Sequence, residues 1–589
     1  MGFLQPTSPD VDAEAFLSRP FLERIKVLAL FWADHGFGSP VAFHLIYITK
    51  VVVLYCLGGL LVVSWTSDVG GLGEFTSWWD QAVVYQKLVL WTVLLEAIGI
   101  AGTWGPLAGH FKPMTGGARY WLRPGTIRMA PWASKVPGTG GDTRTPFDVA
   151  LYALFLASLV AALVMPTGAD GLVRTPWWVV VAVLLVLLGL RDKVIFLASR
   201  GEQYLPAMIF SATLTGADLI IAYKLLIVTV WIGAGVSKFG HHFVNVVPPM
   251  LSNAPTTPAR WIKRLHYRDV ENEDLLPSKF SWFMAHVGGT TVELAIPLVL
   301  LFATNREVAV VAACFMAFFH LFILTAFPLA VPLEWNVLFG FLAVFLFVGY
   351  PNGEGYGVFD FSEPFLLPLI VAGLVFFPVL GNLRPDLVSF LPSMRQYAGN
   401  WASATWVLKP GIEQRFDEIV KPAANQIDQL QAFGFDALES EMTLQKTLAW
   451  RAMHSQGRGL YSLLLRHVDD VDARTIREAE FMCNLFLGWN FGCGHLHDER
   501  LIAALQRRLH LEPGDFQVMW VESQAIGSPV QHYRVIDAAL GVVERGHWYV
   551  AEAVAEQPWL PNGPISLHVD WTLDGYVPAG GTSERPAVS

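Results

Sequence analysis

The order of apolar and polar positions divides the chain into a polar start, a long apolar middle and a mixed C-terminal part. Apolar stretches recur between residues 43 and 383, and about 20 apolar residues suffice for a helix to cross a bilayer. From about Lys409 polar helical periodicity takes over, and residues 515–571 alternate between apolar and polar positions like strands. The pattern predicts an α-helical polytopic membrane bundle followed by a soluble α+β domain.

The apolar middle predicts eight or nine transmembrane helices. The apolar stretches lie at about residues 43–65, 85–104, 147–165, 176–191, 218–237, 282–303, 308–331, 335–350 and 365–383. Residues 191–217 are hard to place, because Arg191, Asp192 and Lys193 interrupt the apolar run. A broken or re-entrant helix would fit there, since irregular backbone at membrane depth needs protein or water around it.

These patterns set the expected domain boundaries. Residues 1–40 form a polar segment that contains a short amphipathic helix, and residues 41–392 form the bundle. Residues 405–575 form the soluble α+β domain, which is of normal domain size. Residues 576–589 are rich in Gly, Pro and Ser, so we expect them to be disordered.

Composition supports a membrane protein and excludes one broad class of function. Hydrophobic residues make up 53% of the chain and charged residues only 15%, whereas soluble domains are about a quarter charged. The formal net charge of −10 argues against a nucleic-acid partner. Four cysteines without a CxxC pair indicate neither a disulfide framework nor a metal knuckle.

The distribution of basic residues predicts the orientation in the cell membrane. The loop at 105–146 carries six basic residues, whereas the loop at 66–84 carries three acidic residues and no Lys or Arg. The positive-inside rule therefore places the N-terminus and the 105–146 loop in the cytoplasm. Basic residues after the last apolar stretch, Arg384 and Arg395 among them, place the C-terminal domain there too.

Ionisable residues within or next to apolar stretches are the strongest chemical signal, because a buried charge is costly unless it is paired or lines a cavity. They are Lys50, Glu96, Lys193, Lys224, Lys238, His286, Glu293, His320 and Glu334. Each could simply make a polar contact between helices, and Lys238 could snorkel to lipid headgroups.

A functional interpretation groups Lys238, Glu293 and His320 as a catalytic set in a partly dry pocket, with the lysine as general base. Gly233 and Gly235 precede the lysine and would let a flat ligand approach the helix. Together with His242 and Glu334 they are the expected substrate-binding residues.

Part of this pattern resembles the vitamin K-dependent γ-glutamyl carboxylase superfamily, also called the horizontally transferred transmembrane domain (HTTM) family. The similar features are the sequence AGVSKF, which ends at Phe239, an acid before an apolar run at Glu293, and a Phe-His pair ending at His320. They fall within residues 190–350, and the chain as a whole resembles an uncharacterised actinobacterial family of membrane proteins.

The resemblance implies that Lys238 corresponds to the lysine that deprotonates a quinol, and that His320 corresponds to the family's helix histidine. Asp192 and Lys193 resemble the family's Asp-Lys. Where the family has Trp-Asn-Asn-His, this chain has Arg200, Glu202, Gln203 and Tyr204. A quinol is thus one expected cofactor or substrate.

The C-terminal domain offers a weaker metal motif. Cys493, His495, His497 and Asp498 could begin a metal site if His510 or His532 completed it. A Gly-rich turn with surface histidines explains the same residues, and we assign no metal site from the sequence.

Two functions therefore remain open. One is a membrane enzyme that acts on a quinol or lipid through Lys238. The other is a non-enzymatic envelope scaffold or lipid-binding protein whose C-terminal domain docks a soluble protein partner. The two hypotheses differ in whether Lys238, Glu293 and His320 should meet in one pocket.

Overall fold

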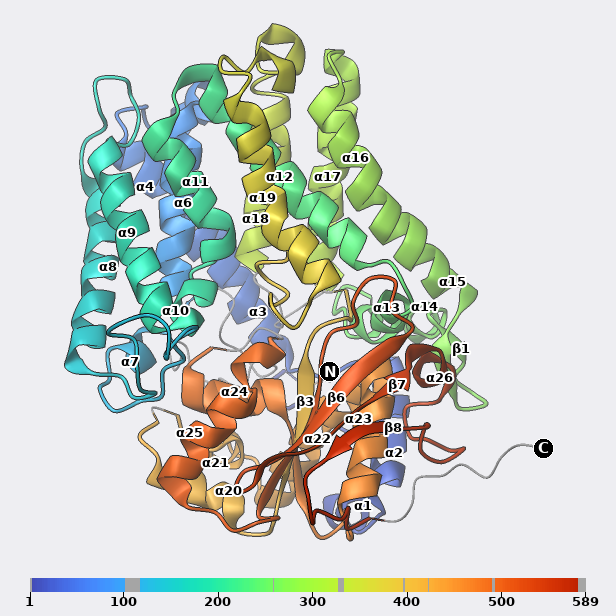
Figure 1. Cartoon of the computed structure of the whole chain (residues 1–589). Coiled ribbons are helices and arrows are strands. Elements are labelled where there is room, and N and C mark those ends of the chain that lie inside the picture. Colours follow the sequence, from blue (N-terminus) through green and yellow to red (C-terminus); the bar gives the residue numbers. More distant parts are fainter. Residues whose placement is uncertain are drawn as a thin grey trace.

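A bundle of long helices stands on a domain built around a β-sheet (Figure 1). The computed structural model describes residues 3–100, 117–257, 259–326, 333–395, 398–421, 423–489 and 493–580, except the side chains of Leu333 and Glu334. This arrangement confirms a mostly helical chain with a C-terminal sheet region.

The bundle contains helices from two stretches of the chain. The first stretch supplies α3 (Val41–Thr49), the π-helix η1 (Lys50–Leu57), α4 (Gly58–Thr66), α6 (Ala82–Ala97), α8 (Pro146–Val164), α9 (Thr175–Arg191), α10 (Lys193–Ala198), α11 (Gly201–Thr213) and α12 (Gly216–Ser237). The second supplies α15 (Lys279–Phe283), the π-helix η4 (Met284–Thr291), α16 (Val292–Phe302), α17 (Arg306–Ala326), α18 (Leu333–Phe347) and α19 (Leu366–Leu383). Of the six long apolar helices, α12 is the most deeply buried.

Within the described residues, six helices are long and apolar enough to cross a membrane. A seventh is added if the bent pair Trp335–Phe347 and Asn352–Asp360 counts as one span. The expected number of eight or nine is therefore not confirmed. The shortfall arises because α6 and α9 have only 16 and 17 residues, and the stretch 191–217 is divided.

The stretch 191–217 is a broken helix, which is one of the two structures that the sequence suggested. Asp192 caps α10 by accepting a hydrogen bond from the Val194 amide at 3.0 Å. Arg200 then adopts a left-handed backbone with φ 55°, which ends α10 and starts α11. Left-handed geometry is unusual for a residue other than glycine and interrupts a helix. The break lies where Arg200 is fully buried.

The sheet domain has six antiparallel strands in the order β4-β3-β5-β6-β7-β8. The strands are β3 (Ser403–Leu408), β4 (Thr475–Glu478), β5 (Phe516–Val521), β6 (Val530–Asp537), β7 (Gly541–Tyr549) and β8 (His568–Thr572). The main helices of the domain are α22 (Ala437–Met453), α23 (Ser455–His467), α24 (Ala479–Leu487) and α25 (Glu499–Leu509). Shorter helices are α20 (Ile412–Arg415), α21 (Gln426–Gln431) and α26 (Val550–Ala555).

Alternate residues of the central strands pack on opposite faces of the sheet. Trp406 and Val518 share a buried cluster with α24, α25 and the membrane bundle. Val407 and Met519 share another with α22 and α23. Because both faces are covered, every residue of β3 is buried. The predicted boundary at residue 405 falls inside this strand, so the sheet domain has to begin earlier.

The N-terminal helices belong to the sheet domain rather than to the bundle. Helix α1 (Ala13–Leu17) and helix α2 (Phe21–His35) lie beside α22 (Figure 1). The Phe21 amide donates to Asp472 at 2.7 Å, and Lys446 donates to the Thr7 carbonyl at 2.7 Å. The predicted amphipathic helix therefore buries its apolar face against the C-terminal domain.

A short connection between the two halves of the bundle also contacts the domain. It holds α13 (His242–Ser252), α14 (Arg260–Arg264) and the two-stranded ribbon β1 (Tyr267–Asp269) and β2 (Asp274–Pro277). The remaining elements are short: η2 (Leu72–Glu74), α5 (Phe75–Trp78), α7 (Ala118–Trp121), η5 (Asn352–Glu354), η6 (Val358–Asp360), η7 (Phe416–Glu418) and η8 (Gly494–Leu496).

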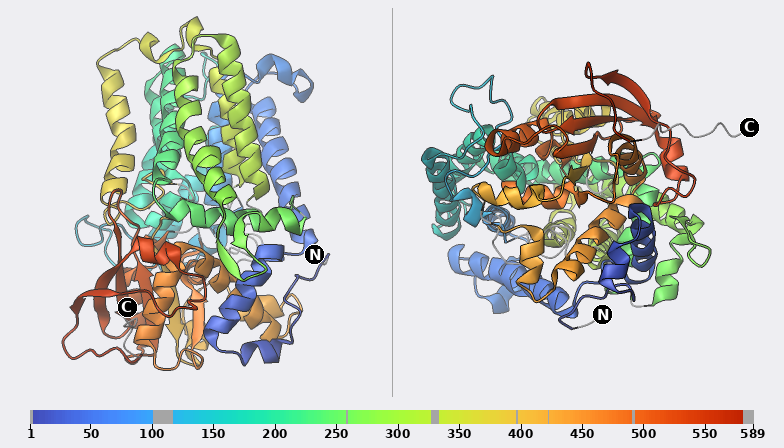
Figure 2. Two further views of the ribbon diagram at one scale, coloured as in Figure 1. Left: turned by 90° about the vertical axis from the view of Figure 1, so that its right-hand side faces the viewer. Right: turned by 90° about the horizontal axis from the view of Figure 1, so that it is seen from below.

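The polar segments of the N-terminal part lie on the same end of the bundle as the sheet domain (Figure 2). Arg508 of α25 pairs with Asp142 of the basic loop at 3.1 Å, and Arg24 of α2 pairs with Asp472 at 3.2 Å. The described parts of these segments therefore lie together at one end of the bundle. That they share one side of the membrane, and that this side is the cytoplasm, stay predictions.

Of the stretch 576–589 that the sequence predicts to be disordered, the structure describes residues 576–580, which contact the sheet domain. Tyr576 stacks on His467 and their side chains lie 2.9 Å apart as a hydrogen-bonded pair. The Gly580 amide donates to the Arg466 carbonyl at 3.0 Å. Residues 581–589 lie outside the described residues.

Candidate functional site

Lys238, Glu293 and His320 line one cavity at the end of the bundle that faces the sheet domain. The cavity has a volume of about 110 Å³ and is bounded by α12, α13, η4, α16, α17 and α18. The three side chains come from three separate helices, and all are buried. The structure therefore brings the three residues together on one cavity.

Lys238 is the first residue after α12, and its Nζ donates to Oε2 of Glu293 in a close ion pair. The side chains are 7% and 6% exposed. The Lys238 ammonium also lies 5.0 Å from the centre of the Phe243 ring, a favourable distance for a cation–π contact. A buried lysine beside one carboxylate and one aromatic face can share or transfer its proton within the pair.

The hydrogen bonds of His320 fix its tautomer. Trp231 Nε1 donates to His320 Nε2 at 2.9 Å, and an indole nitrogen can only donate. Nε2 is thus an acceptor, and the hydrogen of the neutral ring lies on Nδ1, which donates to Asn336 Oδ1 at 3.1 Å. Both ring nitrogens are engaged, so His320 is a neutral, firmly oriented part of the cavity wall.

A π-helix forms one wall of the cavity. Met284, Gly288 and Gly289 of η4 line the cavity, and Glu293 follows in the first turn of α16. π-Helical turns are rare and are frequent at functional sites. A Cβ atom at Gly288 would meet only Met284 at 3.7 Å, so space remains at this position.

The rest of the lining is apolar, with side chains such as Val230, Phe319 and Phe339. Among the described lining residues, the polar side-chain groups are the Lys238–Glu293 pair, the His320 network and the indole N–H of Trp335. Pockets of this kind bind small molecules by apolar contact and orient them through a few polar groups. The arrangement suits a largely apolar molecule that carries one polar head.

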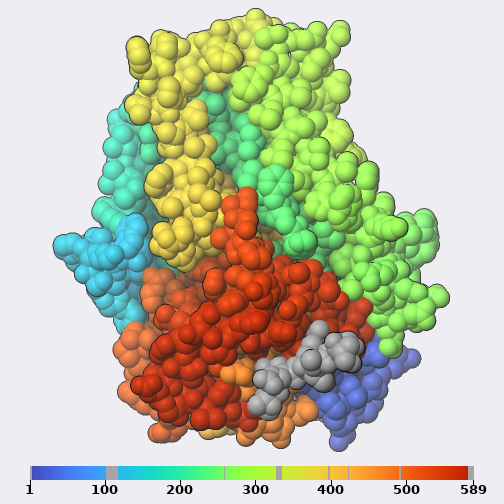
Figure 3. Space-filling model, turned by 45° about the vertical axis from the view of Figure 1, so that its right-hand side comes forward, coloured from blue at the N-terminus to red at the C-terminus, as the bar shows by residue number. Residues whose placement is uncertain are grey.

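The two glycines before Lys238 serve helix packing. A Cβ at Gly233 would lie 2.6 Å from Met394, and one at Gly235 would lie 2.9 Å from Leu294. Gly235 thus lets α16 approach closely enough for Glu293 to reach Lys238. Gly233 also lines an apolar groove of about 570 Å³ between α12 and α19 (Figure 3).

Of the remaining expected ligand residues, His242 lies outside the described cavity lining. His242 is buried between α13 and the sheet domain, with its ring nitrogens 2.7 Å from Ser455 Oγ and 2.8 Å from Gln524 Oε1. Burial lowers the pKa of His242 to about 4, so the ring is neutral. The side chain of Glu334 lies outside the described residues.

The residues that resemble the carboxylase Asp-Lys pair do not reach the cavity. Asp192 accepts a hydrogen bond from Arg144 at 2.8 Å, and Lys193 donates to the His495 carbonyl in the sheet domain. Arg200 lies 5.1 Å above the ring of Trp335, which lines the cavity. Arg200 also pairs with Glu96 at 3.7 Å, so a second buried polar cluster lies behind the wall.

In the cysteine–histidine motif of the C-terminal domain, His495 forms an ion pair and its neighbours are buried. His495 Nε2 lies 2.8 Å from Glu522, and although burial acts against its charge, Glu522 raises the pKa of His495 to about 10. His497 and Cys493 are buried. Burial lowers the pKa of His497 to about 3, so its ring is neutral.

Sequence reasoning missed Trp231, Asn336 and the π-helix. Trp231 precedes Lys238 by two helical turns and so lies on the same face of α12, which is a signal that the spacing contains. Neutral residues carry no large desolvation penalty, and for this reason they did not stand out among apolar neighbours.

Comparison with known proteins identifies the family. The chain belongs to the family described as "Transmembrane protein of unknown function (DUF3556)", which matches residues 1–570. No curated protein and no solved structure matches the chain. The protein is therefore a transmembrane protein.

Proposed function

We propose that this transmembrane protein binds an amphipathic membrane molecule, a lipid or a quinol, in the cavity beside Lys238 and exchanges a proton with it through that lysine. The observation that carries the proposal is the meeting of Lys238, Glu293 and His320 on one cavity. Ionisable side chains inside a helix bundle are costly unless they pair or line a cavity, and residues of this kind commonly mark functional sites.

The lining supports an amphipathic ligand. Aromatic and aliphatic side chains would hold its apolar part, and the Lys238–Glu293 pair would bind its oxygen-bearing head. The cavity lies at the end of the bundle that faces the sheet domain, where we expect a lipid or quinol headgroup to meet water. A carboxylase-like use of Lys238 as the base that deprotonates a quinol is the most specific form of this proposal.

The paired carboxylate supports proton exchange at Lys238. Glu293 can accept the lysine proton inside the pair, which leaves a neutral amine facing the cavity. In a site of low polarity a neutral pair is favoured over a charged one more than it is in water. His320 would orient the ligand through its fixed ring and would not act as a base, because Trp231 uses its only lone pair.

A second function, an envelope scaffold with a docking domain, remains the alternative. A buried ion pair that only joins α12 to α16 would support it. The two functions differ in what the pair must do, because a structural pair needs charge and a catalytic pair needs a removable proton.

The substitution Lys238→Arg separates them. Arginine keeps the positive charge toward Glu293 but does not lose its proton at workable pH. We expect Lys238→Arg to abolish complementation of a deletion strain while membrane levels and melting temperature stay close to those of wild type. Lys279→Arg, at an exposed lysine that starts α15, is the matched control and should complement fully.

Full complementation by Lys238→Arg would reject proton exchange and favour the scaffold. A poorly folded Lys238→Arg protein would be replaced by Lys238→Gln paired with Glu293→Gln, which removes both charges. If that double variant folds and complements, the proton-exchange proposal is wrong as well.

A further inference from the structure

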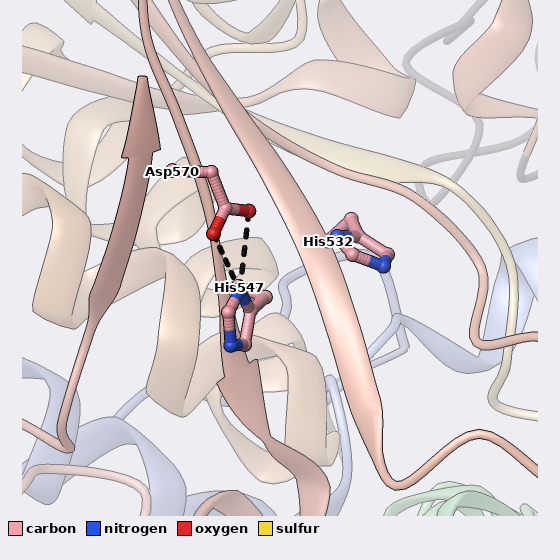
Figure 4. Close-up of side chains that lie close together, drawn as sticks. All are labelled: His532, His547 and Asp570. Atoms are coloured by element: carbon pink, nitrogen blue, oxygen red, sulfur yellow. Dashed lines mark hydrogen bonds and ion pairs between the residues drawn. The ribbon is translucent and has the colours of Figure 1, made fainter. Parts of the chain in front are cut away.

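Three histidines and an aspartate gather on the outer strands of the sheet, away from the membrane cavity. Strands β6, β7 and β8 are adjacent, and His532 lies opposite His547, which lies opposite His568. Asp570 follows two residues after His568 on the same strand and so faces the same side. Figure 4 shows His532, His547 and Asp570 drawn together.

The ligand atoms of His532, His547 and Asp570 lie within 4.8 Å of one another. His547 Nδ1 is 3.1 Å from each carboxylate oxygen of Asp570. The rings of His532 and His547 are 5.8 Å apart, and those of His547 and His568 are 5.1 Å apart and stacked. Small side-chain rotations would bring one atom of each residue to the spacing of metal ligands.

The sheet explains why these side chains share one face. In β6, His532 and Arg534 alternate with Tyr533 and Val535, which pack toward α22 and α23. His532 therefore points to the other face. A β-bulge between Arg545 and Gly546 shifts the pairing of β7 with β8, and bulges often redirect side chains near functional sites.

We propose that His532, His547 and Asp570 bind a divalent transition metal ion of the zinc class. Two imidazoles and one carboxylate are a known donor set for such ions, which prefer nitrogen and carboxylate ligands over water. Three paired strands fix the backbone positions of these residues, so metal binding should cost little conformational entropy. His568 is placed to become a fourth ligand or to support the ring of His547.

The site opens on a large groove that is lined by charged residues of both signs as well as by apolar ones. His532 and Asp570 line a groove of about 780 Å³ between the sheet and the end of α19. Arg545 and Lys193 also line it, as does Arg534, which stacks on Trp520 at 3.8 Å. A metal held by three protein ligands keeps an open position, which is typical of catalytic and not of structural zinc sites. The groove beside the proposed site is lined by basic side chains and also by the carboxylates Asp386, Asp498 and Glu522.

The competing explanation is an ion pair between His547 and Asp570 on the surface of the sheet. Such a pair does not involve His532, whose exposed imidazole makes no side-chain hydrogen bond or ion pair within the part of the chain that the structure describes. The contribution of His532 to metal affinity therefore decides between the two explanations.

The test is calorimetric titration of the full-length protein, purified in detergent without a histidine tag, with Zn²⁺ in a non-chelating buffer. We expect one strong site per chain. His532→Ala and Asp570→Asn should each weaken binding by at least tenfold, because even indirect supporting residues change metal affinity by about 10–100-fold.

The matched control is His510→Asn, at an exposed histidine with left-handed backbone that follows α25. Asparagine tolerates that backbone, and this variant should bind Zn²⁺ like wild type. His568→Ala distinguishes three ligands from four: unchanged affinity indicates three. Wild-type affinity in His532→Ala, or equal losses in His510→Asn and His532→Ala, would overturn the proposal.

Discussion

Lys238 and Glu293 lie 55 positions apart in the sequence and form a buried ion pair at one side of the membrane cavity. Gly235 makes the pair possible, since α16 approaches α12 at this glycine. A buried pair is weak evidence for stability, because desolvation offsets the attraction between its charges. The pair is therefore better explained by what it does in the cavity.

Removal of one partner should destabilise the protein more than removal of both. Lys238→Met leaves the Glu293 carboxylate buried and unpaired, which should cost about 3–5 kcal/mol. Lys238→Met combined with Glu293→Gln should recover most of that loss. Melting temperatures in detergent measure the stability of the single and the double variant. If the double variant lost the sum of the two single losses, Lys238 and Glu293 would not stabilise each other.

Trp231→Phe should destabilise the protein through His320. The variant leaves Nε2 of His320 buried without its donor, and an unsatisfied buried polar group costs about 1–3 kcal/mol. Trp282→Phe, at an exposed tryptophan of α15, is the control and should change the melting temperature little. If both variants lowered the melting temperature equally, the loss would come from the ring contacts of tryptophan and not from the indole N–H that it donates.

The N-terminal helix α2 should stabilise the sheet domain. Ile25 is fully buried in the cluster that includes α22 and α23, and Ile25→Ala should cost about 2–5 kcal/mol. Exposed Glu14→Ala should stay within about 0.5 kcal/mol. Hydrogen exchange of the α22 amides measures the loss of stability at this contact. Unchanged protection in Ile25→Ala would show that α2 is only loosely attached.

Acid should loosen the contact between α13 and the sheet domain. Burial lowers the pKa of His242 to about 4, whereas an exposed histidine titrates near 6.5. The unfolded state thus binds a proton first as pH falls. The stability from neutral His242 is complete above about pH 6.5 and is lost toward pH 4, by up to about 3 kcal/mol.

His242→Gln tests this dependence, because glutamine keeps one donor and one acceptor but does not titrate. The variant should lose less melting temperature between pH 7 and pH 5 than wild type. His454 and His497 are also buried, with pKa values that burial lowers to about 3, and they set the remaining acid sensitivity. An identical pH dependence in wild type and His242→Gln would show that His242 does not cause the acid sensitivity.

The sequence predicted the layout of the fold but missed how its parts join. Apolar length revealed the bundle, and alternation revealed strands β5 to β8. Strand β3 follows the bundle directly and is buried on both faces, so it lacks alternation. An amphipathic pattern shows that α2 has a buried face but does not identify its partner, which lies more than 400 residues later.

The sequence also predicted only part of the candidate site. Charged residues in apolar helices stand out because of their desolvation penalty, and this led to Lys238, Glu293 and His320. The neutral partners Trp231 and Asn336 carry no such signal. The group on β6, β7 and β8 depends on strand register, and register could not be derived from the order of residues.

The most direct test of the central claim is mass spectrometry of the apolar molecules that co-purify with the protein. Gly288→Leu would fill the cavity where space remains, and Gly373→Leu, at an open position of α19, is the matched control. We predict that wild type and Gly373→Leu carry the same lipid or quinone in near-stoichiometric amount and that Gly288→Leu, equally stable, has lost it. The same molecules in equal amounts in all three proteins would contradict ligand binding in this cavity.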